Sequence, residues 1–392
     1  MRILLVTFYY PPDIGPGPLR AESLVTALRA QGRHDLAIEV LTTMPNRYQA
    51  IATDAPEEEQ VGSVRVTRIR LPSHRSGMKD QSMAFGAFAK EVLRRTRGRR
   101  WDLVISTSSR LMTQALATVV ARRSGAQLFL DVRDIFTETI DQVLDHALFR
   151  VALPALRQVE RWTYRQAVGV NVVSPAFVSH VETLRPGRPV RVFTNGIDNI
   201  FLQTDFTSPP SQEPPLVVYA GNLGDGQGVH RVLPAVAAEW VGRARFRLVG
   251  DGGRRPELER AVAEASLSNV EILDPVPRAR LLEQYREARV LFLHLNDLAA
   301  FRKVLPSKIF EYAATGKPIL AGVSGFAAEF LRAEVPGVEV FAPCDLAGMS
   351  AGLIRLLQGP TKIDRTDFCR RYRRDEVMRG LAEAILETAE TK

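Results

Sequence analysis

The sequence has little cysteine and no long uncharged hydrophobic segment. Of its 392 residues only Cys344 and Cys369 are cysteines, and no CxxC spacing occurs, so neither a disulfide framework nor a zinc site is expected. No stretch reaches the roughly 18 uncharged apolar residues that a transmembrane helix needs, and the apolar start of the chain is too short for a signal peptide. We therefore expect a cytoplasmic protein whose residues 3–7 form a buried strand.

The glycine motif of nicotinamide-binding domains is missing as well. The first apolar strand leads into Tyr-Tyr-Pro-Pro at residues 9–12, and no G-x-G-x-x-G follows it, which disfavours a nicotinamide-dependent dehydrogenase. The formal net charge of +8 would suit a nucleic-acid partner, but no aromatic RNA-binding motif supports one. We expect no nucleic-acid partner.

What the chain does have is length, apolar residues and a regular alternation of strand and helix patterns. With 392 residues, 45% of them hydrophobic, it suits two domains with separate cores. The alternation predicts an α/β fold of doubly wound parallel sheets. The predicted strands of the first domain are residues 3–7, 38–42, 64–68, 103–106, 128–131 and 169–173.

A segment rich in proline, serine and threonine, residues 197–215, predicts the domain boundary. It would link a domain of residues 1–196 to a second domain of residues 216–373, and residues 374–392 read as a final helix.

The segment 306–318 predicts a short helix with functional side chains. Pro306 can begin a helix and Gly316 can end it. Lys308 and Glu311 are three residues apart and so share one face near the helix N-terminus. That end favours negative charge, so with Lys308 it would bind a diphosphate, while Glu311 would accept hydrogen bonds from ribose hydroxyls.

Two glycine-rich segments, residues 216–228 and 246–253, each follow a predicted buried strand. Turns of this kind bring backbone N–H groups close to phosphates, and the spacing between the two segments fits one strand–helix–strand unit. The predicted nucleotide-sugar contacts in these segments are Gly221, Asn222, Gln227, Gly250, Asp251 and Gly252.

These segments together resemble the C-terminal half of the retaining GT-B glycosyltransferases of family 4, especially bacterial O-antigen and capsule transferases of the fucosamine-transferase type. Residues 1–12 and 15–17 resemble that family's first strand and loop. The resemblance implies two Rossmann-like doubly wound domains facing a cleft, with a final helix that crosses back to the first domain. It also implies that Val276 lies beside the nucleotide base, and that Gly15 and Gly17 let the first loop approach a substrate closely, unless they serve only as a turn.

The family's charged landmarks are incomplete in this chain. The resemblance would place an Arg and a Lys in the glycine turn where Asn222 and Gln227 stand, and an acid at position 303, where the chain has Lys303. Lys308, helped by Lys303 or Arg302, would compensate for the lost cations, and Ser307 would also contact the donor. We interpret the departures as a subfamily character; the alternative is loss of activity.

In the first domain the segment 131–138 follows a buried strand, so its polar residues should reach the cleft. Arg133, Asp134 and Glu138 are candidates for donor-phosphate or acceptor-hydroxyl contacts, or else an Arg–Asp pair that braces the loop. The other cleft candidates are Arg20, Ser108 and Ser109, although the serines suit a turn equally well. His294, within a predicted strand, is more typical of an interior histidine than of a base.

Positive charge is concentrated between residues 63 and 100. There, eleven Lys or Arg accompany only Asp80 and Glu91, a net charge of +9. Phe85, Phe88, Val92 and Trp101 recur among the cations at roughly helical spacing, as in a helix that lies on anionic lipid; residues 148–156 are a second candidate. The alternative is a solvated cationic face with an ordinary core stripe.

The sequence has no Asp-x-Asp motif, which the resemblance associates with metal-dependent transferases of another fold, so we expect neither a metal nor a cofactor. Lys308, Glu311, Arg133 and Asp134 are the predicted catalytic residues, with Lys308 stabilising the leaving phosphate. We predict transfer of a sugar, such as an acetamido sugar, from a UDP-sugar to a lipid-linked acceptor, by a protein peripheral to the inner face of the cytoplasmic membrane. A non-catalytic sugar-nucleotide-binding subunit and a UDP-sugar 2-epimerase are the alternatives, and the oligomeric state stays open.

Overall fold

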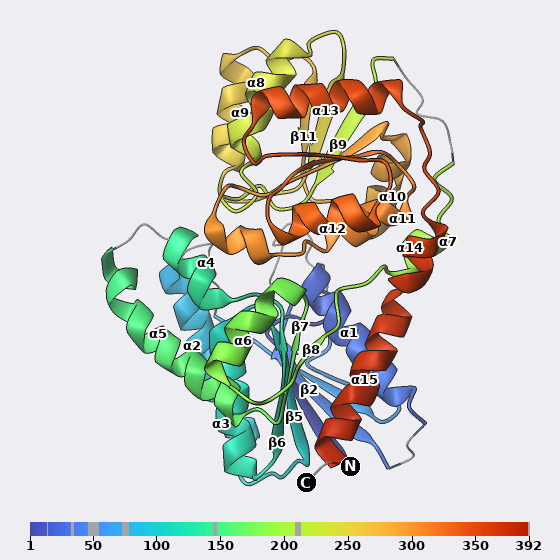
Figure 1. Cartoon of the computed structure of the whole chain (residues 1–392). Helices are drawn as coiled ribbons and strands as arrows, with labels where there is room; N and C mark the ends of the chain where they lie inside the picture. Colours follow the sequence, from blue (N-terminus) through green and yellow to red (C-terminus); the bar gives the residue numbers. More distant parts are fainter. Residues whose placement is uncertain are drawn as a thin grey trace. The chain divides into compact units, whose positions relative to one another are not determined.

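The computed structural model describes residues 1–13, 15–32, 35–45, 55–72, 78–143, 147–207 and 213–390, and within these ranges side-chain positions are described except at 78–79, 140–143 and 147–151. The chain forms two compact units. One comprises Met1–Asn195 with Asp375–Lys392, and the other comprises Gly196–Arg374 (Figure 1). Among the described residues no helix is long and apolar enough to cross a membrane.

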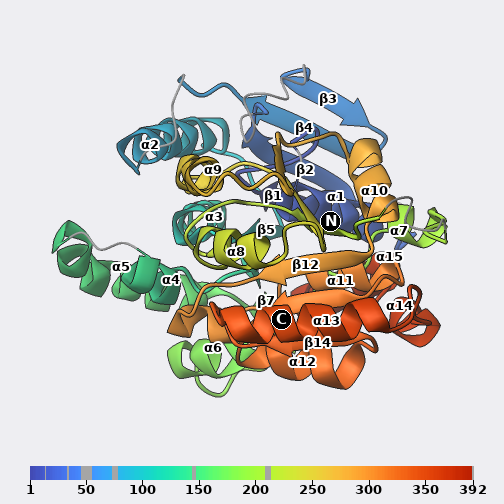
Figure 2. The same cartoon turned by 90° about the horizontal axis from the view of Figure 1, so that it is seen from above.

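The N-terminal unit is built on an eight-stranded sheet with the order β3-β4-β2-β1-β5-β6-β7-β8. All neighbours are parallel except the antiparallel pair β3–β4, in which β3 lies at the edge of the sheet (Figure 2). The strands are β1 (Arg2–Val6), β2 (Ala37–Thr43), β3 (Glu58–Val61), β4 (Val64–Ile69), β5 (Leu103–Ser108), β6 (Gln127–Val132), β7 (Gly169–Val172) and β8 (Val190–Val192).

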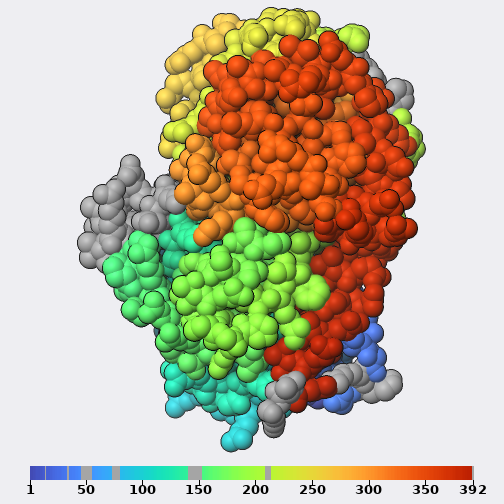
Figure 3. Space-filling view, in the orientation of Figure 1, coloured from blue at the N-terminus to red at the C-terminus, as the bar shows by residue number. Residues whose placement is uncertain are grey.

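The helices of this unit include one from the far end of the sequence. They are α1 (Pro16–Arg29), α2 (Met78–Arg95), α3 (Leu111–Ser124), α4 (Phe136–Val143), α5 (Ala147–Gln166), the 3₁₀ turn η1 (Pro175–Phe177), α6 (Val178–Leu184) and α15 (Arg374–Glu390). Met378, Leu381 and Ile385 of α15 are buried in the same core as Ile3 and Leu103. Figure 3 shows this red helix lying against the green part of the same unit.

The C-terminal unit is built on a six-stranded, all-parallel sheet with the order β11-β10-β9-β12-β13-β14. Its strands are β9 (Leu216–Ala220), β10 (Arg245–Val249), β11 (Val270–Leu273), β12 (Val290–His294), β13 (Ile319–Gly322) and β14 (Val338–Phe341). The chain adds β10 and β11 on one side of β9 and then returns to place β12 on its other side. The carboxyl ends of β9 and β12 therefore meet where the strand order reverses, which is where α/β sheets bind ligands.

Helices cover both faces of this second sheet (Figure 1). One core contains side chains of α10, α11, α12 and α14, and the other contains side chains of α8, α9 and α13. The helices are α7 (Asn199–Gln203), α8 (Val229–Glu239), α9 (Arg255–Glu264), α10 (Arg278–Glu287), η2 (Ala299–Lys303), α11 (Lys308–Ala314), α12 (Phe326–Glu334), α13 (Leu346–Gln358) and α14 (Thr366–Arg371).

The predicted α/β fold of two doubly wound sheets is confirmed, and all six strands predicted for the first domain are present. The predicted linker differs, because its first part packs into the second unit. Ile197, Phe201 and Phe206 are buried in the core of that unit, since apolar side chains recur through this segment despite its Pro, Ser and Thr content. The remainder includes residues 208–212, which lie outside the described ranges.

Candidate functional site

The loop of residues 221–228, between β9 and α8, interlocks with the loop that follows β10. The N–H of Gly221 donates to the carbonyl oxygen of Val249 at 2.9 Å. Gly250 lies so close that a Cβ added to it would stand 1.8 Å from the carbonyl oxygen of Gly221. Both glycines have φ near 155°, so the close approach of the two loops depends on residues without side chains.

Helix α11 faces this loop because one hydrogen bond ties it to the end of β9. The hydroxyl of Tyr312 accepts a hydrogen bond from the N–H of Ala220 at 3.2 Å. The side chain of Lys308 then lies against Gly221, where an added Cβ would stand 2.5 Å from Lys308 Cε. The side chain of Lys308 therefore packs against the glycine loop.

Lys308 and Glu311 carry opposite charges that no protein group neutralises within the part of the chain that the structure describes. Neither the amine of Lys308 nor the carboxylate of Glu311 has a hydrogen bond or an ion pair there; the amine lies 5.9 Å from the centre of the Tyr312 ring. Burial lowers the pKa of Lys308, and the nearby charge of Glu311 opposes this shift. Partly buried charges without partners are costly in a folded protein, so both groups retain unused hydrogen-bonding capacity.

The two amides of the glycine loop bind each other. Asn222 Nδ2 donates to Gln227 Oε1 at 2.8 Å. They occupy the positions at which the family resemblance implied an arginine and a lysine, so this loop offers amide groups in place of two cations.

The other predicted donor contacts differ in how far their side chains are already engaged. Asp251 Oδ1 accepts a hydrogen bond from the N–H of Gly252 at 2.8 Å, so it is used within its own turn. Val276 is partly buried against the core of the unit. Ser307 precedes α11 without a capping hydrogen bond, and Lys303 is the last residue of η2.

His294, at the end of β12, is an interior histidine. Its Nδ1 lies 2.6 Å from the carbonyl oxygen of Gln227, and its Nε2 accepts a hydrogen bond from the N–H of Cys344 at 3.0 Å. The proton therefore resides on Nδ1. Burial lowers the pKa of this histidine to about 4, despite the hydrogen bond to Gln227, so the ring is neutral at pH 7 and supports the glycine loop from below.

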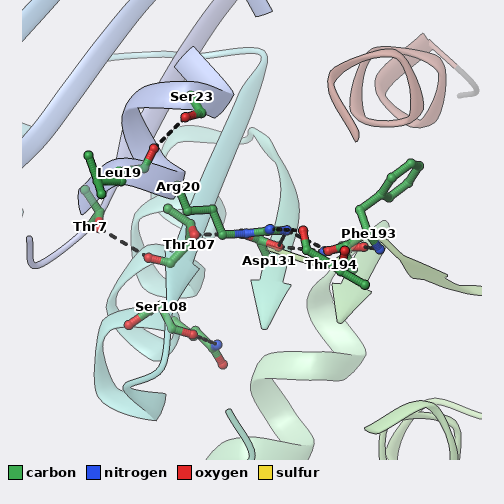
Figure 4. Close-up of polar contacts among 11 residues, drawn as sticks. Thr7, Leu19, Arg20, Ser23, Thr107, Ser108, Asp131, Phe193 and Thr194 are labelled. Carbon is green, nitrogen blue, oxygen red and sulfur yellow. Dashed lines mark hydrogen bonds and ion pairs between the residues drawn. The ribbon is translucent and has the colours of Figure 1, made fainter. Parts of the chain in front are cut away.

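In the N-terminal unit the most prominent polar group is a buried ion pair between α1 and β6 (Figure 4). Arg20 Nε and Nη2 donate to the two carboxylate oxygens of Asp131 at 2.7 and 2.9 Å. The guanidinium also donates to the carbonyl oxygens of Thr194 and Phe193. Arg20 is 1% exposed. The prediction of Arg20 as a cleft contact is therefore wrong, because the protein itself uses this side chain.

Asp131 is held in its charged form by this network. Burial alone would raise its pKa, but the charge and hydrogen bonds of Arg20, with hydrogen bonds from Thr107 and Asn171, outweigh burial and lower the pKa. Thr107 and Asn171 donate to it at 2.6 and 2.7 Å. The network joins α1, β5, β6, β7 and the segment after β8 in one saturated group.

The first loop is close to a protein side chain. A Cβ added to Gly17 would stand 2.5 Å from Arg133 Nη1. Gly17 thus makes room for a guanidinium of its own unit, while Gly15, with φ of 143°, precedes α1.

The polar residues after β6 form a cluster with a histidine that the sequence analysis did not single out. His180 lies between two carboxylates, 3.1 Å from Glu138 and 3.2 Å from Glu160. Burial would lower the pKa of His180, but its hydrogen bonds to these carboxylates raise the pKa to about 9. Burial raises the pKa of Asp134 to about 6, against the hydrogen bond that Thr139 donates to it.

The two serines after β5 differ from each other. Ser108 is buried and its hydroxyl accepts a hydrogen bond from the N–H of Arg110 at 2.9 Å, while its carbonyl oxygen accepts one from Gln114. Ser108 therefore forms the turn before α3, which was the alternative to a cleft contact for this serine. Ser109 is only partly buried.

Three of the four apolar residues singled out in the basic segment face the core, whereas Phe85 is partly buried and Met83 of the same helix is 64% exposed. Phe88 and Val92 of α2 are fully buried and Trp101 is 5% exposed. The prediction that they form a lipid-facing stripe is wrong, because helical spacing alone does not say which partner an apolar face meets. In the second candidate segment Leu153 is buried too, and the side chains of residues 148–151 lie outside the description.

Several cations of the same segment are neutralised by acids. Arg94 and Arg95 each bind Glu91 at 2.6 Å, and Arg99 binds Glu39 at 2.7 Å. The high net charge of this stretch therefore overstates the positive charge it presents. Within the described ranges no three His, Cys, Asp or Glu side chains are grouped closely enough to hold a metal ion.

Comparison with known proteins agrees with this architecture. Residues 18–196 match the family described as Glycosyl transferase 4-like domain, and residues 214–359 match Glycosyl transferases group 1. The putative colanic acid biosynthesis glycosyl transferase WcaI of Escherichia coli is 24% identical over 345 residues, which are 81% of this chain and 82% of that protein. The 2-deoxystreptamine glucosyltransferase of Streptomyces kanamyceticus is 24% identical over 326 residues, 76% of this chain and 80% of that protein.

Solved structures show the same fold. The crystal structure of Anabaena Alr3699/HepE in complex with UDP-glucose superposes with a TM-score of 0.71 at 17% sequence identity, covering 99% of this chain and 100% of that one. The two matched family domains correspond to the two sheet-based units of the structure. The chain is therefore a glycosyltransferase of the GT4-like type with the GT-B fold.

Proposed function

We propose that this glycosyltransferase takes a sugar from a UDP-sugar bound at the carboxyl ends of β9 and β12. The observation that carries the proposal is that Lys308, which lies against the glycine loop, and Glu311, three residues further along the same helix, have no protein partner within the described ranges. A nucleoside diphosphate offers each of them what it lacks: phosphate oxygens for the amine and ribose hydroxyls for the carboxylate. The name of the Anabaena neighbour, solved with UDP-glucose, supports a uridine donor.

In this proposal Lys308 acts on the reacting bond. When the sugar departs, negative charge grows on the leaving phosphate, and a fixed ammonium group a few ångströms away stabilises it without needing a metal ion. At seven residues α11 is short, so we assign this role to the lysine side chain and not to the helix dipole. With retention of configuration, the leaving phosphate would accept the proton of the acceptor hydroxyl on the same face of the sugar.

We assign the acceptor to polar groups of the N-terminal unit, with a lipid-linked saccharide as the acceptor and an acetamido sugar of the fucosamine type as the donated group. The name of the WcaI relative, a putative colanic acid biosynthesis transferase, supports polysaccharide assembly. Asp134, whose pKa burial raises to about 6, and Glu138 are the acceptor-hydroxyl candidates, with Arg133 beside them.

Such an acceptor would require the protein to reach a membrane from the cytoplasm. Since Phe88 and Val92 of α2 are buried, we propose that this helix is drawn to anionic lipid mainly by electrostatic attraction. Lys90, Arg97 and Arg100 are exposed and lack acidic partners among the described residues, which favours them over the paired arginines.

The deciding experiment is calorimetric titration of UDP into the purified protein in EDTA, with GDP as the comparison nucleotide. Glu311→Ala should weaken UDP binding by about tenfold or more, because charge-assisted hydrogen bonds contribute about 1.5–3 kcal/mol each. Glu329→Ala is the matched control, since Glu329 is an exposed acid in the first turn of another helix of the same unit. Equal effects of the two substitutions, or no binding of UDP by the unmodified protein, would overturn the donor assignment.

A further inference from the structure

The amide bridge of the glycine loop is fixed in place by glycines of two loops. A Cβ on Gly224 would stand 2.7 Å from Asn222 Nδ2, and a Cβ on Gly252 would stand 2.6 Å from Asn222 Oδ1. The carbonyl oxygen of Gln227 is held by His294 from the end of β12. The Asn222 side chain thus packs against the backbone of two loops, and His294 holds the main chain of Gln227, so the bridge is a built part of the loop.

The bridge leaves its outer hydrogen-bonding groups available. Gln227 accepts through Oε1, and its Nε2 has no acceptor among the described residues. Asn222 is exposed and Gln227 is partly buried. The loop can therefore donate hydrogen bonds to a ligand but brings no charge to it.

The two arginines that follow β10 are already paired with acids. Arg254 binds Asp225 at 2.6 Å and also binds Glu257. Arg255 binds Glu259 and Asp274.

Two further cations near the loop also have partners within the protein. Arg302 lies 3.5 Å from Asp297, and Arg231 donates to Asn296. Arg231 is held by a neutral amide, and of the cations named here Lys308 is the one whose charged group has no hydrogen bond or ion pair within the described ranges.

We infer that the Asn222–Gln227 bridge makes this a single-cation donor site, which holds the diphosphate through Lys308 alone and so keeps the affinity for the UDP product low relative to the UDP-sugar. The inference rests on the proposed function and deepens it. A terminal phosphate ionises a second time near pH 6, so released UDP carries about one more negative charge than a UDP-sugar. Each additional cation in the loop would favour the more highly charged product, whereas a neutral bridge does not.

The test compares ligands of increasing charge on variants that change only the charge of the loop. Uridine, UMP, UDP and UDP-glucose are titrated calorimetrically at low and high salt. Gln227→Lys should tighten UDP by about fivefold at low salt, a gain typical of an exposed charge pair, while uridine is unchanged and UDP-glucose gains less. Gln227→Glu keeps an acceptor for Asn222 Nδ2 and should weaken UDP by a similar factor.

Gln358→Lys is the matched control, because it makes the same change of charge at the exposed C-terminal end of α13. Lys308→Met should remove most of the difference in affinity between uridine and UDP. The single-cation inference is wrong if the ratio of UDP affinity to uridine affinity does not change with the charge at position 227. It is also wrong if this ratio is unchanged in Lys308→Met. In both cases binding of uridine would show that the nucleoside part of the proposed site is intact. If the unmodified protein binds neither uridine nor UDP, the proposed function falls with it.

Discussion

The two units differ in how their charged residues near the carboxyl ends of the strands are paired. In the N-terminal unit Arg20 and Asp131 are 1% and 0% exposed. All three nitrogen atoms of the Arg20 guanidinium donate hydrogen bonds to acceptors within the protein. In the C-terminal unit Lys308 and Glu311 are partly buried and have no such partner in the described ranges. A saturated buried pair holds structure together, whereas an unsaturated pair is available to a ligand. The proposed donor site rests on this distinction.

The largest effect that tests this comparison is on stability. Asp131→Ala leaves Arg20 as a buried charge without its partner, and should lower the free energy of unfolding by about 3–5 kcal/mol in urea titrations. Lys308→Met, which removes a charge that has no partner to lose, should change it by less than about 1 kcal/mol. Asp367→Ala is the surface control, since the ion pair of Asp367 with Arg370 is mostly exposed. A loss from Lys308→Met as large as that from Asp131→Ala would erase the distinction.

The two histidines of these units should give pH dependences of opposite sign. The pKa of His180 is raised to about 9, so its stabilisation is present below pH 6.5 and is lost as the pH rises through 9. The pKa of His294 is lowered to about 4, so stability is lost as the pH falls from 6.5 toward 4. Each shift corresponds to at most about 3 kcal/mol.

Urea midpoints measured from pH 4 to 10 check this, because His180→Gln should flatten the alkaline limb and His294→Gln the acidic one. A variant that flattens the opposite limb would contradict the assignment of the two partners. Imidazole NMR signals give a direct reading, since the chain has only six histidines.

The smallest effect per residue concerns paired and unpaired cations of the basic segment. Replacing Lys90, Arg97 and Arg100 by Gln should weaken binding to anionic vesicles at low salt by about 1 kcal/mol per residue. Replacing Arg94 and Arg95, which share Glu91, should have less effect. Co-sedimentation with vesicles of phosphatidylglycerol and phosphatidylcholine measures the binding of both variants. Equal losses of binding per residue would contradict the distinction between paired and unpaired cations.

Local patterns predicted much of the fold and the residues of the proposed donor site. Apolar runs bounded by glycine or polar residues located the strands, and a lysine and a glutamate three residues apart located the unpartnered pair of α11. These features depend on neighbours in the sequence, where periodicity and turn chemistry operate.

Contacts between distant segments were not predictable in this way. Arg20 and Asp131 are 111 residues apart in the sequence, and no residue close to Arg20 in the sequence indicates that its partner is a carboxylate. His180 meets Glu138 and Glu160 from another helix, and no motif surrounds it. Likewise Phe88 and Val92 have the spacing of an amphipathic helix, but spacing does not distinguish lipid from core.

Helix α15 closes the core of the N-terminal unit with Met378, Leu381 and Ile385, which are among the last residues of the chain. On the ribosome, residues 196–374 emerge before this helix does, so the second unit can complete its core while the first still exposes apolar surface. The order in which the polypeptide is synthesised is thus not the order in which its cores close. A truncated variant that lacks residues 375–392 would therefore expose part of the core of the N-terminal unit.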